Sequence, residues 1–81
     1  MPRPRVYPEP TTLEAEIGLK LRLERERLGW SRTPVAVDLG ITESGLAYWE
    51  LGEYRTSLSN LQRWARALDM ELTISLTRKE D

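Results

Sequence analysis

Residues 31–52 decide the fold of this 81-residue chain, and they read SRTPVAVDLGITESGLAYWELG. Ser31 is a residue type that caps helix N-termini, and Pro34 is acceptable only because it falls in the first turn of the helix that follows. Gly40 stands where the chain needs a left-handed backbone to leave that helix, and Thr42 then offers a second cap. The pattern predicts two short helices joined by a tight turn.

Apolar residues recur at helical spacing in both short helices. We expect Val35, Ala36 and Leu39 to form the buried side of the first helix. Leu46 and Trp49 stand three residues apart, and we expect them to form the buried side of the second helix. That helix is predicted to end at Leu51-Gly52. Each helix therefore has one side available for a shared core.

A longer helix is predicted on each side of this pair. Thr11 or Thr12 caps the preceding helix, which ends near Gly29 and carries lysine, arginine and glutamate on a solvated outer face. Its predicted apolar stripe consists of Leu13, Ile17, Leu21 and Leu28. Ser57 or Ser59 starts the following helix. Its predicted inward residues are Leu61, Trp64, Ala65 and Leu68.

The hydrophobic period changes to strict alternation over residues 70–77. The apolar members of this segment are Met70, Leu72, Ile74 and Leu76. Alternation predicts a half-buried strand, and a strand without a partner leaves its backbone donors and acceptors unpaired. Pairing with the same strand of a second copy supplies that partner and predicts a two-fold homodimer. Continuation of the preceding helix, or a tail lying over the core, remains the alternative.

The two ends of the chain look unlike the helical domain predicted for residues 11–69. Residues 1–10 contain four prolines and predict a flexible, extended arm. Its Arg3 and Arg5 fit either the minor groove of DNA or a solubilising tail. Residues 78–81 predict a frayed, charged end.

Composition excludes several classes of function. The chain has no cysteine and no histidine, which removes disulfides, thiolate nucleophiles, imidazole bases and the usual zinc or iron sites. We therefore expect no cofactor, and the scattered carboxylates show no pairing typical of an enzyme. No run of apolar residues predicts a signal peptide or a membrane span, so a cytoplasmic protein is expected. The net charge of -1 counts against an undirected nucleic-acid binder.

The spacing of the helices and glycines resembles a known family over residues 17–68. The residues that carry the resemblance are Leu21, Arg22, Arg25, Gly29, Trp30, Ser31, Ala36, Leu39, Gly40, Ile41, Leu46, Trp49, Glu50 and Gly52. In these positions the chain resembles the Cro/phage-repressor, or XRE, family. The resemblance implies an all-α, lambda-repressor-like fold of four helices, with the predicted C-terminal strand added. It also implies that the third helix enters the major groove of double-stranded DNA.

The resemblance implies roles for individual residues. Arg25 and Glu50 match an ion pair between the first helix and the end of the third, and Ala36 matches a close helix crossing. The DNA-facing positions are Thr42, Glu43, Ser44, Ala47 and Tyr48 on the third helix, with Arg32 and Arg55 as phosphate contacts. Glutamate can accept from cytosine, or it can simply stabilise a helix N-terminus, and both interpretations stay open for Glu43.

The end of the chain narrows the resemblance further. Gly29-Trp30-Ser31 together with residues 67–76 looks like the HipB type of antitoxin, in which a C-terminal strand pairs across a dimer. That group represses its own operon and holds a toxin partner. The first hypothesis is therefore a repressor that binds a palindromic operator as a homodimer. The second is a protein-interaction module for a toxin or phage partner, which the charge balance favours, whereas the small outward Ser44, Gly45 and Ala47 favour groove entry.

Overall fold

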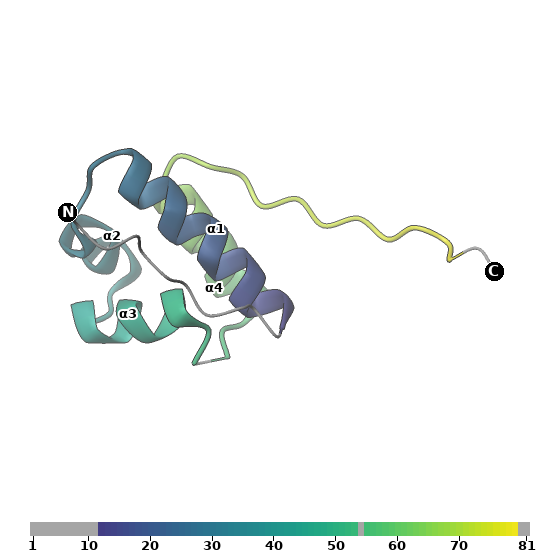
Figure 1. Cartoon of the computed structure of the whole chain (residues 1–81), viewed down its shortest axis with the longest axis horizontal. Coiled ribbons are helices and arrows are strands. Elements are labelled where there is room, and N and C mark those ends of the chain that lie inside the picture. Colours follow the sequence, from purple (N-terminus) through teal and green to yellow (C-terminus); the bar gives the residue numbers. More distant parts are fainter. Residues whose placement is uncertain (1–11, 54, 80–81) are drawn as a thin grey trace, which may run out of the picture.

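The structure, a computed structural model, describes residues 12–53 and 55–79. These residues form four helices in the order α1 (Leu13–Arg27), α2 (Arg32–Leu39), α3 (Glu43–Leu51) and α4 (Leu58–Ala67), which confirms the predicted all-α, helix-turn-helix class. Figure 1 shows α1 lying over α4, with α2 at one end and α3 crossing below them. The predicted arm, residues 1–10 with Arg3 and Arg5, lies outside the described residues.

Three of the four helices begin with a side-chain cap to the residue three positions on. The hydroxyl of Thr12 accepts a hydrogen bond from the Ala15 N–H at 3.0 Å. At the start of α3 the Thr42 hydroxyl accepts from the Gly45 N–H at 2.9 Å. At the start of α4 the Ser57 hydroxyl accepts from the Asn60 N–H at 3.1 Å. Ser31 has the same extended backbone before α2 but makes no such bond. The physical reason is Pro34, because proline has no N–H at the position that the cap would satisfy.

The turn between α2 and α3 depends on Gly40. This residue has φ +69°, and its N–H bonds back to α2, as the sequence predicts for a left-handed helix end. Gly52 ends α3 in the same conformation, with φ +73°. A Cβ atom on Gly52 would lie only 2.4 Å from the Cβ of Ala15 in α1. Gly52 therefore permits both the turn and the close approach of α1.

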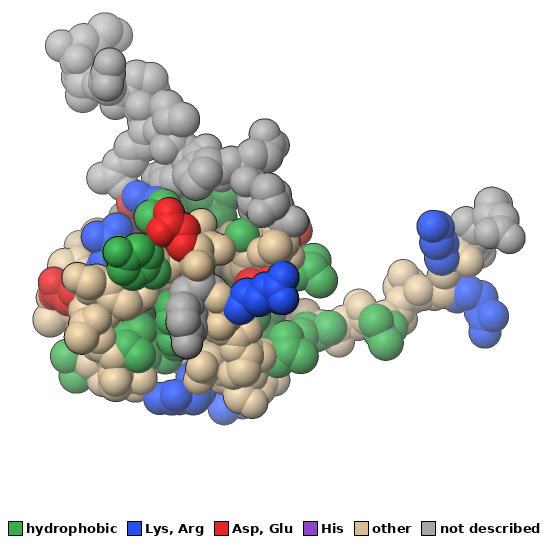
Figure 2. Space-filling model, turned by 90° about the horizontal axis from the view of Figure 1, so that it is seen from below, with side chains coloured by type: hydrophobic (Ala, Val, Ile, Leu, Met, Phe, Trp, Pro, Cys, Tyr) green, Lys and Arg blue, Asp and Glu red, His purple; other side chains and the backbone are tan. Residues whose placement is uncertain are grey.

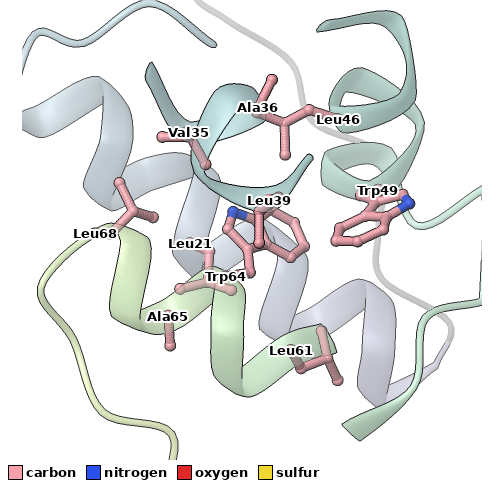
Figure 3. Close-up of a cluster of buried hydrophobic side chains, with 10 residues drawn as sticks. All are labelled: Leu21, Val35, Ala36, Leu39, Leu46, Trp49, Leu61, Trp64, Ala65 and Leu68. Carbon is pink, nitrogen blue, oxygen red and sulfur yellow. The ribbon is translucent and has the colours of Figure 1, made fainter. Parts of the chain in front are cut away.

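The core lies where the four helices meet, and Figure 3 shows its side chains converging from all of them. The predicted inward residues of α2, α3 and α4, and of the residue that follows α4, are all buried: Val35, Ala36, Leu39, Leu46, Trp49, Leu61, Trp64, Ala65 and Leu68. The rings of Trp49 and Trp64 pack with their centroids 5.8 Å apart and their planes tilted by 56°. This aromatic pair links α3 to α4.

The predicted apolar stripe of α1 is partly wrong. Leu13 is 74% exposed and Leu28 is 36% exposed, whereas the buried face consists of Ala15, Gly18, Leu21 and Arg25. The reason is close packing, because a Cβ atom on Gly18 would lie 2.9 Å from the backbone oxygen of Trp49. A helix that approaches its neighbour this closely buries small residues at the contact, and Leu13 and Leu28 lie at the edges of that contact.

After Leu68 the chain leaves the helices. Residues 70–79 form no helix, and Figure 1 shows them running away from the domain, so continuation of α4 is wrong. Leu72 packs against the core, but Ile74 and Leu76 are exposed, the latter at 97%. The predicted strand needs a partner that a single chain does not supply. Residues 70–77 as a dimerisation strand therefore remain a prediction.

Candidate nucleic-acid interface

The two sides of α3 differ sharply in burial. Leu46, Trp49 and Glu50 face the core, whereas Ser44 is exposed and Tyr48 is 54% exposed. Successive helical residues are rotated by about 100°, so these two share the side opposite the core. Figure 2 views the molecule from the side on which α3 lies in Figure 1. The structure thus leaves this side of α3 accessible to a ligand.

Four of the predicted DNA-facing residues lie together on this helix. Ser44, Ala47 and Tyr48 are on its outward side, and Glu43 is in its first turn. The structure gives Glu43 a partner, because its carboxylate accepts a hydrogen bond from the hydroxyl of Thr33 in α2. The Thr42 hydroxyl accepts from the backbone of α3 as its cap. Two of the predicted polar contacts are therefore already engaged within the protein.

A buried ion-pair network fixes α3 against α1 and α2. Arg25 in α1 donates from Nε to Glu50 Oε2 at 2.7 Å and from a terminal nitrogen to Glu50 Oε1 at 3.2 Å. Arg25 also donates to the backbone oxygen of Trp30 at 2.7 Å. The pair that the family resemblance implies is thus present. Because both side chains are almost fully buried, its role is to orient the helix rather than to add much stability.

Arg32, expected at a phosphate, joins the same network. Its Nε donates to Glu50 Oε1 at 2.9 Å, although 36% of its side chain stays exposed at the start of α2. Together with Arg22, Arg25 and Trp30 it lines a depression of about 420 Å³. Arg32 can therefore present its remaining guanidinium nitrogens at the surface while one nitrogen bonds Glu50.

Arg55 lies apart from the network, exposed in the loop between α3 and α4. The predicted dimerisation residues lie elsewhere, since Met70, Leu72 and Ile74 line a groove together with residues of α1 and α4. Leu76, the last of that set, extends beyond it. The structure thus gathers the predicted site residues into two surfaces, one centred on α3 and one on the C-terminal segment.

Sequence reasoning missed two contacts of this site. The sequence does not predict Thr33 as the partner of Glu43, nor Arg32 as a partner of Glu50. The contact between Arg32 and Glu50 joins residues 18 positions apart and depends on how α2 crosses α3. No sequence signal distinguishes Thr33 from other exposed hydroxyls. Among the described residues, no acidic cluster suits a metal ion, and no helix is long and apolar enough to cross a membrane.

Comparisons with known proteins agree with this geometry. The family model described as Helix-turn-helix matches residues 21–74, so the chain belongs to the helix-turn-helix family, in its XRE-type branch. Among solved structures, a HipB variant in complex with an O2 20mer is similar, with a TM-score of 0.68 and 17% identity. The match covers 86% of this chain and 97% of that chain. No curated protein sequence matches the chain.

Proposed function

We propose that the chain is a transcriptional repressor without catalytic activity, which binds a palindromic operator as a homodimer and acts as an antitoxin-type autoregulator. One observation carries the proposal: the outward side of α3, with Ser44 and Tyr48, is free while Leu46, Trp49 and Glu50 anchor the helix from below. In helix-turn-helix proteins the second helix of the motif reads the major groove. Membership of that family and the likeness to HipB support the same assignment.

The phosphate contacts of the proposal come from the ends of α3 and α2. Arg55 is exposed directly after α3, and Arg32 is half-exposed at the N-terminus of α2, where backbone N–H groups also attract anions. Thr42 caps the N-terminus of α3, where backbone N–H groups attract anions in the same way. These contacts offer DNA phosphates local partners in a chain of net charge -1, and they act against the repulsion from Glu43 and Glu53 beside the same helix.

The dimer of the proposal forms through the C-terminal segment. A groove of about 850 Å³ lies between α1, α4 and this segment, and its apolar side chains include Leu13, Ile17, Leu58, Met70 and Ile74. Several of these are exposed in one chain, as is Leu76 beyond them. A second copy whose segment pairs antiparallel with this one would cover the groove and satisfy both backbones. Two α3 helices would then face successive major grooves.

The test is a DNA titration of the full chain at two salt concentrations. The ligands are a random duplex of operator length and a duplex from the region upstream of its own gene. We expect tighter binding to the upstream duplex and a salt dependence for both. Arg55→Ala should weaken binding to every duplex and reduce the salt slope by about one for each arginine removed. Ser44→Ala should act mainly on the preferred duplex, and equal weakening of all duplexes would contradict the placement of α3.

The alternative function is a protein-interaction module, for a toxin for example, that uses the same fold with little DNA binding. The charge balance favours it, because a chain of net charge -1 has little general attraction for DNA phosphates. The titration separates the two functions. Undetectable binding to both duplexes would favour the interaction module and overturn the repressor.

A further inference from the structure

The outward side of α3 has an unusual chemistry for a helix that reads bases. Its residues are Ser44, Ala47, Tyr48 and Leu51, which all lie opposite the buried side. Ala47 offers a methyl group, Tyr48 an aromatic ring and Leu51 a branched alkyl chain. The polar groups of these four side chains are the two hydroxyls of Ser44 and Tyr48. Arginine, lysine, asparagine and glutamine make the usual bidentate contacts to guanine and adenine, and α3 contains none of them.

The polar groups next to this side are engaged inside the protein. The Thr42 oxygen accepts from the Gly45 N–H at 2.9 Å, and the Glu43 carboxylate accepts from Thr33. Only one Glu43 oxygen takes the Thr33 bond, so the second can still accept from a cytosine amino group. This carboxylate is the one charged group on α3 within reach of a base edge, and it serves cytosine but not guanine, adenine or thymine. Direct hydrogen-bond readout by α3 is therefore limited.

Apolar surface continues from this side into a shallow pocket. The pocket has a volume of about 510 Å³ and is lined by Ile41, Gly45, Tyr48, Trp49 and Glu53. Tyr48 belongs to both the pocket and the outward side, so its ring forms the boundary between them. A Cβ atom on Gly45 would lie 3.1 Å from the oxygen of the Thr42 cap, so glycine suits this position. Tyr48 thus joins the outward side of α3 to a mainly apolar pocket that also includes Glu53.

We infer that α3 selects its DNA sites by packing Ala47 and Tyr48 against thymine methyl groups. Thymine is the base whose 5-methyl group projects into the major groove, and apolar side chains recognise it by contact rather than by hydrogen bonding. The inference rests on the proposed function, because it assumes that α3 enters the groove. Burying one methyl group changes affinity by roughly fourfold. Two such contacts, one in each half of a palindrome, multiply to roughly 15-fold.

The experiment begins with the full chain and a random duplex library, from which bound sequences are selected. The preferred duplex is then resynthesised with deoxyuridine for thymidine, which removes the 5-methyl groups and keeps the base pairing. We expect a loss of affinity of roughly fourfold for each contacted thymine. The same replacement in an unselected duplex should leave nonspecific affinity unchanged. Equal affinity for the thymidine and deoxyuridine forms of the selected duplex would overturn the inference while leaving sequence-specific DNA binding intact.

Variants show which side chains make the contact. Tyr48→Ser and Ala47→Gly should each bring the ratio of thymidine to deoxyuridine affinity closer to one. Val37→Ser makes a matched loss of apolar surface on α2 and should leave that ratio unchanged. An unchanged ratio in both α3 variants would overturn the assignment to Ala47 and Tyr48. If the library yields no preferred duplex at all, the proposed function fails together with the inference, and the apolar side of α3 then belongs to a protein partner.

Discussion

Replacing Glu50 with glutamine tests whether removing one partner of the buried ion pair destabilises the domain, although the pair as a whole adds little stability. Glu50 Oε2 accepts from Arg25 at 2.7 Å, and Oε1 accepts from Arg25 at 3.2 Å and from Arg32 at 2.9 Å. In Glu50→Gln one oxygen becomes an NH₂ group that cannot accept, so at least one of these bonds is lost in either orientation of the amide. Arg25, which is nearly fully buried, also loses its closer counter-charge and keeps the Glu26 carboxylate at 4.0 Å.

Breaking a buried pair from one side costs about 3–5 kcal/mol. A domain of this size has a total stability of roughly 4–12 kcal/mol, so Glu50→Gln should remove a large share of it. Urea unfolding measures the change, with the fluorescence of the buried Trp49 and Trp64 as the signal. The double variant Arg25→Met with Glu50→Leu should recover most of the loss, because it removes both charges and keeps the volume.

The control is Glu24→Gln. The hydrogen bond from Arg27 lowers the pKa of the Glu24 carboxyl, yet this pair lies at the surface within α1. A carboxyl with a lowered folded pKa stabilises the protein above its unfolded pKa, and the effect fades as the pH falls through the folded value. We expect no measurable change at neutral pH, because water screens the pair. Equal losses in Glu50→Gln and Glu24→Gln, or no recovery in the double variant, would refute the reasoning.

Four further variants test the packing, the capping and the dimer. Gly18→Ala should cost about 1–3 kcal/mol, since its Cβ would meet the Trp49 oxygen at 2.9 Å, and a more stable protein in urea unfolding would contradict this. Thr42→Ala should cost about 1 kcal/mol through loss of the α3 cap. The matched Ser31→Ala, at a helix start without a cap bond, should cost clearly less in the same assay. Ile74→Lys should convert the dimer to a monomer in sedimentation, and an unchanged mass would remove the strand-pairing proposal.

The sequence predicts α2, α3 and α4 well because large apolar residues mark their buried sides. Val35, Leu46 and Trp64, for example, each occupy the side that periodicity assigns to the core. The buried side of α1 is harder to predict from the sequence, because it includes Ala15 and Gly18, whose small side chains give almost no hydropathy signal. The need for glycine at position 18 follows from the close approach of α3, which the sequence does not show. Periodicity therefore predicts that α1 is a helix and that Leu21 is buried, but it misses the small residues through which α1 packs against α3.

The candidate site was predictable in outline but not in its hydrogen bonds. Helical spacing alone places Ser44 and Tyr48 on the outward side of α3, and the family resemblance supplies the Arg25–Glu50 pair. The partner of Arg32 depends on how α2 crosses α3, which is a tertiary property. A charged side chain at a helix start suits either a phosphate or a neighbouring carboxylate, and only the fold shows which carboxylate is within reach. Residue type therefore predicts the chemistry of a contact better than its partner.

Stability and recognition depend on opposite sides of α3. Trp49 and Glu50 join the helix to α1, α2 and α4, so their substitution alters both the fold and the angle at which α3 meets a ligand. Ser44 and Tyr48 take no part in the core. Their substitution is expected to change binding with little effect on unfolding. The separation means that a loss of binding in Tyr48→Ser, with unchanged urea unfolding, reports on recognition alone, whereas a similar loss in Glu50→Gln reports on the orientation of the whole helix.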